Sequence, residues 1–349
     1  MNYSSNPFCI QYGIIPNYYI GTPDQEIEII DTFNSEHPSS RTYIISAVRG
    51  SGKTVLLSHI SEVLKNDNSW IVINLTTGNS SGMLEMLEQE LSKDILVQAL
   101  YTKPELEVSA GVINLKFENN APSSVHMSNI RTILKFIKGK RKLLITIDDV
   151  VNNENVREMT EAFQSFLIEG YDVFLLMTGL YENIEELEEV KNLTFLIRAP
   201  RIKMTPLDTA AITDKYVKAF NITEAESKYM AALTVGYPFA FQALGYERWL
   251  RRGSSIDEIL PYLDERIKPS YEMIWKKLSA KDKKILTCMA ENEDIVKVQM
   301  IRELAGMESN EFAVYRDRLL KKGIVKTEEY GTLKFALPRF ADFVRRNIY

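Results

Sequence analysis

Cysteine and histidine are scarce in this chain of 349 residues, which contains two cysteines and three histidines. Cys9 and Cys288 lie far apart in the sequence and form no Cys-x-x-Cys metal or redox motif, a usage that fits a reducing compartment. The three histidines do not cluster and belong to no His-Glu-x-x-His motif; they are His37, His59 and His126. Zinc chemistry and a Ser-His-Asp triad therefore have little support.

Basic charge in excess and long apolar runs are absent as well. The formal net charge is -5, so no chain-wide positive field favours nucleic acid, and any such contact requires a local patch. No stretch approaches the roughly 20 apolar residues of a membrane-spanning helix. The opening residues MNYSSNPFCIQYG lack the basic flank and apolar run of a signal peptide. We therefore expect a cytoplasmic protein without a membrane partner.

The first half of the sequence alternates between apolar strands and helices. Uninterrupted apolar strands separated by helices indicate a parallel sheet covered on both faces, which is an α/β fold. One long amphipathic helix is expected over residues 82–100. The expected strands cover residues 42–47, 69–76, 142–150, 171–179 and 201–207.

One segment interrupts this alternation. Residues 105–118, ELEVSAGVINLKFE, alternate apolar and polar side chains about a Ser-Ala-Gly turn, which predicts an inserted β-hairpin. Two interpretations of the hairpin stay open: a packed surface insertion, or a finger that contacts a ligand.

The sequence AVRGSGKT, residues 47–54, is close to the phosphate-binding loop pattern G-x-x-x-x-G-K-[ST]. Ala47 replaces the first glycine, at a strand exit where a methyl group fits if φ is negative. The loop follows a buried strand and opens a helix, whose free N–H groups and dipole hold phosphates. Residues 49–55 are therefore predicted to contact the nucleotide: Arg49, Gly50, Ser51, Gly52, Lys53, Thr54 and Val55.

Chemistry assigns roles within this site. Lys53 would lie between the β- and γ-phosphates of ATP, and Thr54 would bind Mg2+ through its hydroxyl. The strand 142–150 ends in two acids, of which Asp148 would hold the metal. Asp149 would orient the attacking water; the alternative is an acid that caps a helix or faces solvent. The cofactors expected from these residues are ATP or ADP and Mg2+.

The motifs AVRGSGKT, LLITIDDV, VFLLMTG, RAPRIKMTPL and GYP, in this order, resemble those of the AAA+ and STAND P-loop ATPases. The nearest likeness is to bacterial and archaeal ATPases related to origin-recognition initiators, from Pro16 to the C-terminus. The resemblance implies base contacts from the N-terminal segment, a polar γ-phosphate sensor, an arginine finger that reaches a neighbouring subunit, and a lid signature. The base contacts would come from Tyr18, Tyr19 and Ile20, and the γ-phosphate sensor would be Thr178. The arginine finger would be Arg198 or Arg201, and the lid signature includes Gly236 and Pro238.

The sequence departs from that family at two places. Its acidic strand ends Asp-Asp where Asp-Glu is usual, so Asp149 reaches about one methylene less and hydrolysis is expected to be slow. Initiator lids place an arginine just after the glycine of this helix, whereas the first arginine here is Arg248. Thr178 as a plain strand-end residue, and Arg198 and Arg201 as surface salt-bridge partners, remain alternatives.

After Asp208 the strands stop and three helices follow, which predicts three domains: 1–207, 208–268 as a helical lid, and 269–349. In the last domain we expect three helices, with Ser279 capping the first and Ser309 or Asn310 the third, and then a hairpin turning near Gly331. This order predicts a winged helix. Duplex DNA contact is expected through residues 309–346, with protein docking as the alternative. The cations concerned are Arg316, Arg318, Lys321, Lys322, Arg339, Arg345 and Arg346.

Together these features favour a slow, Mg2+-dependent ATPase that acts as a nucleotide-controlled switch or a DNA-associated assembly factor. The rival hypothesis is an adaptor or transcription regulator that keeps its nucleotide without hydrolysing it. A homo-oligomer or a protein partner is compatible with either.

Overall fold

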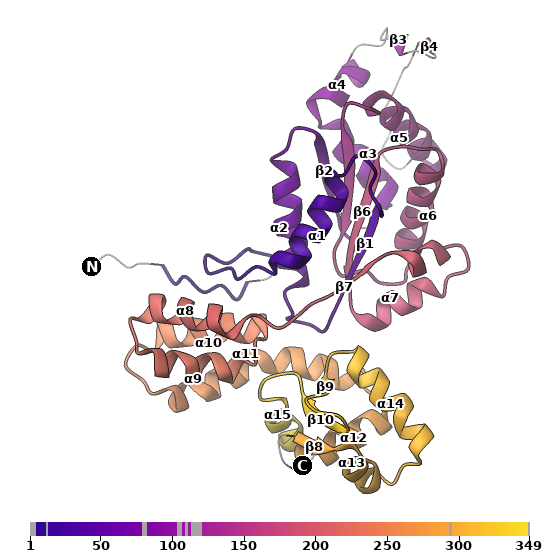
Figure 1. Cartoon of the computed structure of the whole chain (residues 1–349). Helices are drawn as coiled ribbons and strands as arrows, with labels where there is room; N and C mark the ends of the chain where they lie inside the picture. Colours follow the sequence, from indigo (N-terminus) through magenta and orange to yellow (C-terminus); the bar gives the residue numbers. More distant parts are fainter. Residues whose placement is uncertain are drawn as a thin grey trace. The chain divides into compact units, whose positions relative to one another are not determined.

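The computed structural model describes residues 5–11, 13–78, 82–102, 107–108, 111–112, 121–292 and 295–347. These residues form two compact units, each assembled from non-consecutive segments (Figure 1). The sheet unit comprises Pro23–Ser46 and Lys53–Lys203, and the helical unit comprises Met1–Thr22, Ala47–Gly52 and Met204–Tyr349. This division into two units does not test the predicted boundaries of the three domains, which stay predictions.

The sheet unit contains five parallel strands in the order β2-β5-β6-β1-β7, which confirms the predicted α/β fold. Each strand is shorter than predicted, by one to four residues. The bounds are β1 Thr42–Ser46, β2 Trp70–Leu75, β5 Lys142–Ile147, β6 Val173–Gly179 and β7 Arg201–Lys203.

Helices cover both faces of this sheet, and Figure 1 draws α1 and α2 on one side with α5 and α6 on the other. On the first side Phe33 of α1 packs against Tyr43 of β1 and Phe174 of β6, with ring centroids 5.6 and 5.0 Å apart. On the second side Ile44 and Ile145 belong to one apolar cluster with α3, α5 and α6. The helices are α1 Pro23–Asn34, α2 Lys53–Lys65, α3 Met83–Ser92, α4 Ile95–Thr102, α5 Ser123–Ile137, α6 Glu154–Ile168 and α7 Tyr181–Glu188, with the 3-10 turn η1 Thr194–Arg198.

The prediction of one helix over residues 82–100 was wrong, because two helices, α3 and α4, occupy this stretch. The chain breaks at Lys93 and Asp94. The Asp94 carboxylate accepts the N–H of Leu96 at 2.9 Å and pairs with Arg141 at 3.1 Å. A side chain that caps a new helix competes with continuation of the old one.

Within the predicted hairpin 105–118, strands β3 Glu107–Val108 and β4 Gly111–Val112 pair antiparallel. The other residues of that range lie outside the described part of the chain.

The helical unit encloses one continuous apolar core. Ser279 caps α12 in a reciprocal capping box with Asp282, as predicted. The expected cap of α14 was wrong, since Glu308 holds the N-cap position and makes no side-chain cap bond. Helices here are α8 Thr209–Phe220, α9 Glu224–Thr234, α10 Pro238–Leu250, α11 Ile256–Lys276, α12 Ala280–Ala290, α13 Val298–Ala305, α14 Ser309–Lys321 and α15 Phe340–Asn347.

A small antiparallel sheet of order β8-β10-β9 accompanies the last helices. Its strands are β8 Ile295–Lys297, β9 Val325–Lys326 and β10 Thr332–Phe335, and Gly331 turns the chain before β10 with φ +78°. The hairpin of β9 and β10 was predicted near this glycine, whereas β8 was not predicted.

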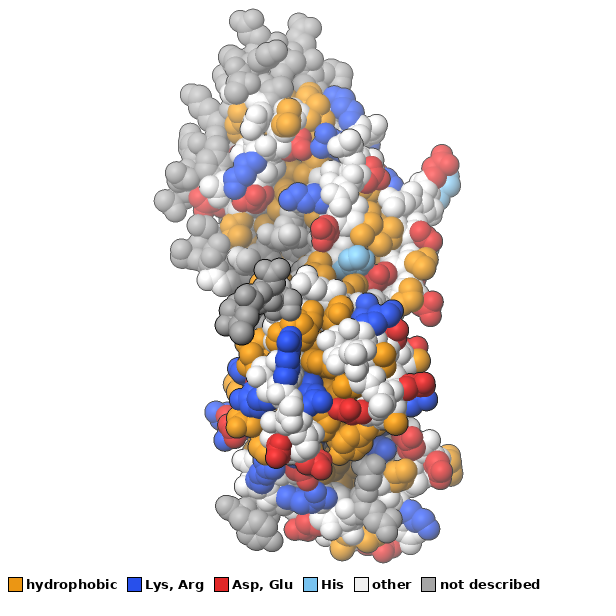
Figure 2. All heavy atoms as spheres, turned by 90° about the vertical axis from the view of Figure 1, so that its left-hand side faces the viewer, with side chains coloured by type: hydrophobic (Ala, Val, Ile, Leu, Met, Phe, Trp, Pro, Cys, Tyr) orange, Lys and Arg blue, Asp and Glu red, His pale blue; other side chains and the backbone are white. Residues whose placement is uncertain are grey.

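Two surface properties bear on the partner predictions. Among the described residues, none of the helices combines the length and the apolar character that crossing a bilayer requires. On the face drawn in Figure 2, acidic and basic side chains are interspersed, as the modest net charge leads one to expect.

Candidate nucleotide site

The loop from Ala47 to Gly52 joins β1 to α2 and takes a glycine-dependent conformation. Gly50 and Gly52 have φ of +75° and +89°, a region that L-residues rarely adopt. A Cβ on Gly50 would also collide with the hydroxyl of Tyr237. Ala47 is not among the described non-glycine residues with positive φ. The loop therefore needs its two later glycines, and an alanine fits in place of the first.

Helix α2 begins at Lys53, directly after this loop. Lys53 is 8% exposed, and the hydroxyl of Thr54 donates to the Asp148 carboxylate at 2.9 Å. A helix N-terminus that carries a lysine and a hydroxyl is suited to an anion with its metal. The sheet unit thus brings the predicted metal residues Thr54 and Asp148 together.

Asp148 and Asp149 follow the end of β5, and Thr178 of the neighbouring strand β6 holds both. The fully buried Thr178 hydroxyl donates to the Asp148 carboxylate and accepts the Asp149 N–H at 3.0 Å. The Val150 N–H donates to the Thr178 carbonyl at 2.8 Å. Thr178 thus fixes the turn that carries the acidic pair; its predicted role as a γ-phosphate sensor stays a prediction.

Asp149 has φ +49°, one of four such non-glycine residues in the described chain. Strained backbone of this kind persists where the surroundings hold it, and it gathers at functional sites. Here Thr178 supplies part of that hold through the Asp149 N–H.

The donor set near α2 suits a hard cation. A hydroxyl and a carboxylate are oxygen ligands, and Mg2+ keeps several waters and phosphate oxygens besides one or two carboxylates. Among the described residues, no group of three or more His, Cys, Asp or Glu side chains could hold a metal ion alone. Thr54 and Asp148 therefore fit a metal that arrives with a nucleotide.

In the helical unit, the GYP sequence contacts the loop. The Tyr237 hydroxyl donates to the Arg49 carbonyl, and the Phe239 N–H donates to the Gly50 carbonyl at 3.1 Å. Burial raises the pKa of Tyr237, which keeps its phenol protonated as a donor. The methylene groups of Pro238 lie 3.6 Å from where a Cβ of Gly52 would be. Residues 237–239, at the start of α10, therefore support the loop at Arg49, Gly50 and Gly52.

Gly236 makes this approach sterically feasible. Its φ is +73°, and a Cβ there would lie 2.8 Å from the Leu207 carbonyl oxygen. The Gly236 carbonyl accepts the Leu207 N–H at 2.8 Å. Gly236 is thus a backbone requirement, whereas its contact with nucleotide stays a prediction.

The predicted base-contacting segment belongs to the same unit. Tyr18 is half-buried: its ring makes a T-shaped contact with that of Phe8, with the centroids 5.4 Å apart, and Lys215 Nζ lies 5.5 Å from the Tyr18 centroid. Its carbonyl accepts from Gln242, a residue not singled out from the sequence. Tyr19 and Ile20 are half-buried as well. Base contact by these residues stays a prediction.

Comparisons with known proteins give one family-model match and solved structures of similar fold. A family model described as Domain of unknown function (DUF8462) matches residues 269–344. Comparison with the curated proteins gives no match. A solved Walker-type ATPase of Pyrococcus abyssi is 16% identical, with 94% of this chain and 96% of that chain covered and a TM-score of 0.61. The ORC2 protein of Aeropyrum pernix, solved as ADPNP-ADP complexes, is 13% identical, with 97% and 96% covered and a TM-score of 0.59.

This chain has the P-loop NTPase fold. The parallel sheet, the loop between β1 and α2, and the acids after β5 occupy the places that this fold gives them.

Within this P-loop NTPase fold, the predicted finger arginines differ in setting. Arg198 is exposed at the end of η1, whereas Arg201 forms an ion pair with Glu188. Arg248, the first arginine of α10, donates to Glu226 at 2.9 Å and to the Ser254 carbonyl. Arg248 is therefore engaged inside the helical bundle, and Arg198 is the less constrained of the two finger candidates.

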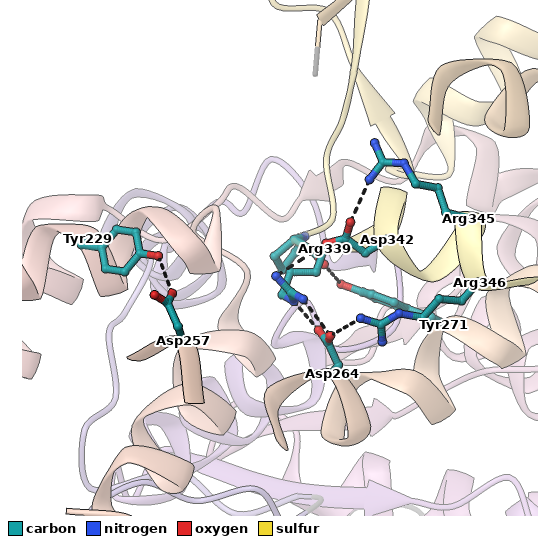
Figure 3. Close-up of polar contacts among 9 residues, drawn as sticks. Tyr229, Asp257, Asp264, Tyr271, Arg339, Asp342, Arg345 and Arg346 are labelled. Atoms are coloured by element: carbon teal, nitrogen blue, oxygen red, sulfur yellow. Dashed lines mark hydrogen bonds and ion pairs between the residues drawn. The ribbon is translucent and has the colours of Figure 1, made fainter. Parts of the chain in front are cut away.

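The basic edge expected at the C-terminus is largely neutralised within the helical unit (Figure 3). Arg339 and Arg346 both donate to Asp264 of α11, the latter at 2.9 Å. Arg345 pairs with Asp342 at 2.8 Å. Arg318 and Lys321 of α14 also have acidic partners, Asp282 and Asp317. Arg316 and Lys322 form no ion pair with another described residue.

Proposed function

We propose that this protein binds ATP or ADP with Mg2+ at the loop 47–54 and hydrolyses ATP slowly. The observation that carries the proposal is the hydrogen-bonded set of Thr54, Asp148 and Thr178 in the sheet unit, with Thr54 in the first turn of the helix that follows a glycine loop in the sequence. Lys53 would contact the β- and γ-phosphates. Bound Mg2+ would supply charge neutralisation at the phosphates, held through Thr54 and Asp148.

Asp149 is the residue we assign to the attacking water. Its carboxylate follows the metal-binding Asp148 directly, and Thr178 fixes its backbone at positive φ. Arg198, exposed on η1, is the better candidate for an arginine supplied to a neighbouring subunit. Turnover that rises with protein concentration, and that Arg198→Ala abolishes without loss of ATP binding, would support this assignment.

The experiment for binding compares Lys53→Ala with Lys65→Ala, a lysine exposed in the last turn of the same helix. Loss of a charge-assisted phosphate contact should weaken ATP affinity tenfold or more, about 1.4 kcal/mol, in isothermal titration. Lys65→Ala should bind like wild type. If Lys53→Ala also does, the loop is not the nucleotide site.

The experiment for hydrolysis uses Asp148→Asn and Asp149→Asn. We expect Asp148→Asn to remove the Mg2+ dependence and Asp149→Asn to remove turnover while ATP still binds. Wild-type protein that binds ADP and Mg2+ but shows no turnover would favour the non-hydrolysing adaptor.

For the C-terminal module 269–349 we propose a winged helix that docks a protein segment in preference to duplex DNA. DNA binding draws on cations free to contact phosphates, but here Arg318, Lys321, Arg339 and Arg346 pair with carboxylates. Val314 is 65% exposed near the middle of α14. Salt-dependent binding of duplex DNA that Arg316→Ala and Lys322→Ala weaken would reverse this preference.

A further inference from the structure

One end of the sheet unit carries a run of basic residues. Between Glu118 and Asp148 the sequence contains six Lys and Arg and no Asp or Glu, although the net charge of the whole chain is -5. The run extends from the second half of α5 to the first residue of β5. Its members are Arg131, Lys135, Lys138, Lys140, Arg141 and Lys142. Cations gathered in this way attract anionic partners.

Three of the six cations already have partners within the protein. Arg131 pairs with Glu169 at 2.9 Å, and Arg141 pairs with Asp94 at 3.1 Å. Lys142 is half-buried, and its Nζ donates to a backbone carbonyl at 2.9 Å. The other three are exposed, form no ion pair with another described residue, and are named the lysine patch: Lys135, Lys138 and Lys140.

Aromatic rings hold two of the patch lysines in place. Lys138 Nζ lies 5.8 Å from the ring centroid of Tyr171, and Lys140 Nζ lies 4.0 Å from that of Phe136. A ring face attracts an ammonium group but accepts few of its hydrogen bonds. Because an ammonium has three N–H donors, both lysines keep donors for the oxygens of a further partner.

Two exposed isoleucines flank the lysine patch. Ile95 is 85% exposed and Ile168 is 79% exposed, more than any other described Val, Leu or Ile side chain. Ile95 follows Asp94 and Ile168 precedes Glu169, the two acids that pair with arginines of the basic run. Those ion pairs therefore bring both isoleucines to the end of the sheet unit where α5 passes into β5. Exposed apolar side chains beside unpaired cations indicate a surface that another body covers.

We propose that this end of the sheet unit binds the surface of an anionic lipid bilayer. The lysine patch contacts the phosphate groups of the lipids, and Ile95 and Ile168 enter the boundary between headgroups and acyl chains. Anionic bilayers attract clustered cations, and apolar side chains add affinity that salt does not screen. A nucleic-acid backbone would occupy the lysines but leave both isoleucines in water, so a bilayer accounts for all five side chains. The expectation of no membrane partner rested on the lack of an apolar span, which binding of this kind does not require.

This surface lies at the opposite end of the strands from the acidic pair. Lys142 begins β5, a strand of 6 residues, and Asp148 follows its last residue. At about 3.3 Å per residue, the two ends of β5 are roughly 20 Å apart. Binding to a bilayer therefore leaves the Thr54 and Asp148 site open, and the proposal does not depend on ATP binding.

The first test is co-sedimentation of the full chain with vesicles of equimolar phosphatidylglycerol and phosphatidylcholine, and with vesicles of phosphatidylcholine alone. Wild-type protein should bind the anionic vesicles about tenfold or more tightly at about 0.1 M salt. The double variant Lys138→Gln, Lys140→Gln should bind them about 30-fold more weakly, which is about fivefold for each lysine. The control variant Lys191→Gln, Lys203→Gln removes equal charge from exposed lysines of the same unit, and its affinity should change less than about twofold.

The second test concerns the isoleucines. Ile95→Ser and Ile168→Ser should each weaken binding to the anionic vesicles about fivefold. This loss should persist at about 0.5 M salt, where the effect of the lysine substitutions disappears. Ile197→Ser, at a position 62% exposed on η1, is the matched control and should bind like wild type. All these side chains are exposed, so the variants should melt with wild type.

Three outcomes would overturn the proposal. The first is equal binding to anionic and neutral vesicles, and the second is binding to neither. The third is binding of a duplex or single-stranded oligonucleotide that the double variant Lys138→Gln, Lys140→Gln weakens and Ile95→Ser does not, without binding to vesicles. That result would assign the lysine patch to nucleic acid instead of lipid.

Discussion

Replacing Thr178 by valine tests the geometry of the acidic pair most directly. The two side chains have nearly the same shape, and Thr178 is fully buried, so the substitution removes one hydroxyl and leaves the packing in place. That hydroxyl donates to the Asp148 carboxylate and accepts the Asp149 N–H. Valine leaves both groups without this partner, although Thr54 still donates to Asp148.

The expected loss of stability follows from these two bonds. A buried N–H without its partner costs about 1–3 kcal/mol, and a hydrogen bond to a charged group contributes about 1.5–3 kcal/mol. A loss of about 3 kcal/mol in a unit of this size lowers the Tm by roughly 6–12 °C. Release of the positive φ of Asp149 would recover part of this loss.

Differential scanning calorimetry without nucleotide measures this effect. Thr160→Val is the matched control, because Thr160 is equally buried and its hydroxyl donates to the carbonyl of Val156 within the same helix. We expect Thr160→Val to cost less than about 1 kcal/mol. A Thr178→Val protein that melts with wild type, or no lower than Thr160→Val, would refute the assigned role.

Three further predictions concern other parts of the chain. Gly236→Ala should destabilise the helical unit by about 2 kcal/mol or more in urea unfolding, because φ is +73° and the new Cβ would meet the Leu207 carbonyl at 2.8 Å; an unchanged midpoint would contradict this. Asp264→Asn should lower the free energy of unfolding by about 3 kcal/mol, since Arg339 and Arg346 lose the carboxylate that they share. The control Asp257→Asn should change stability little, because the hydrogen bond of Asp257 with Tyr229 is exposed. Equal effects of the two substitutions would refute this prediction. Burial raises the pKa of Tyr216 and Tyr271. Their contribution to stability is therefore fully present below about pH 10, the pKa of an unfolded tyrosine, and is lost as the pH rises further. Ultraviolet titration should show both phenols ionising only when the protein unfolds, and ionisation in the folded protein would contradict this.

The sheet could be predicted because its strands are continuous apolar runs, and the loop because its residues are consecutive. The break at Asp94 could not, since the residues around it keep a helical apolar pattern and one capping bond decides the outcome. Strand β8 has three residues, too few for a periodic signal.

The role of Thr178 in the turn depends on β5 and β6 being neighbours in the sheet. The apolar pattern of the strands does not predict their order in the sheet. Residue type and pattern were enough to bring Thr54 and Asp148 together, as observed, whereas the roles of Lys53, Thr54 and Asp148 toward nucleotide and Mg2+ stay predictions. Gln242 interrupts an apolar helical run, which is a weak signal, and its partner Cys9 is 233 residues away. Arg339 was assigned to a basic edge because the sequence did not reveal its pairing with Asp264, which lies 75 residues earlier.

The separation between Cys9 and Gln242 also has a consequence during protein synthesis. Phe8 and Cys9 are synthesised well before α10, whose Gln242 accepts the Cys9 N–H and lies 233 residues later. At about 5–20 residues per second, this interval lasts roughly 10–50 s. During that time the apolar Phe8 has no native partner in α8 or α10, so a ribosome paused before residue 204 would present it to chaperones.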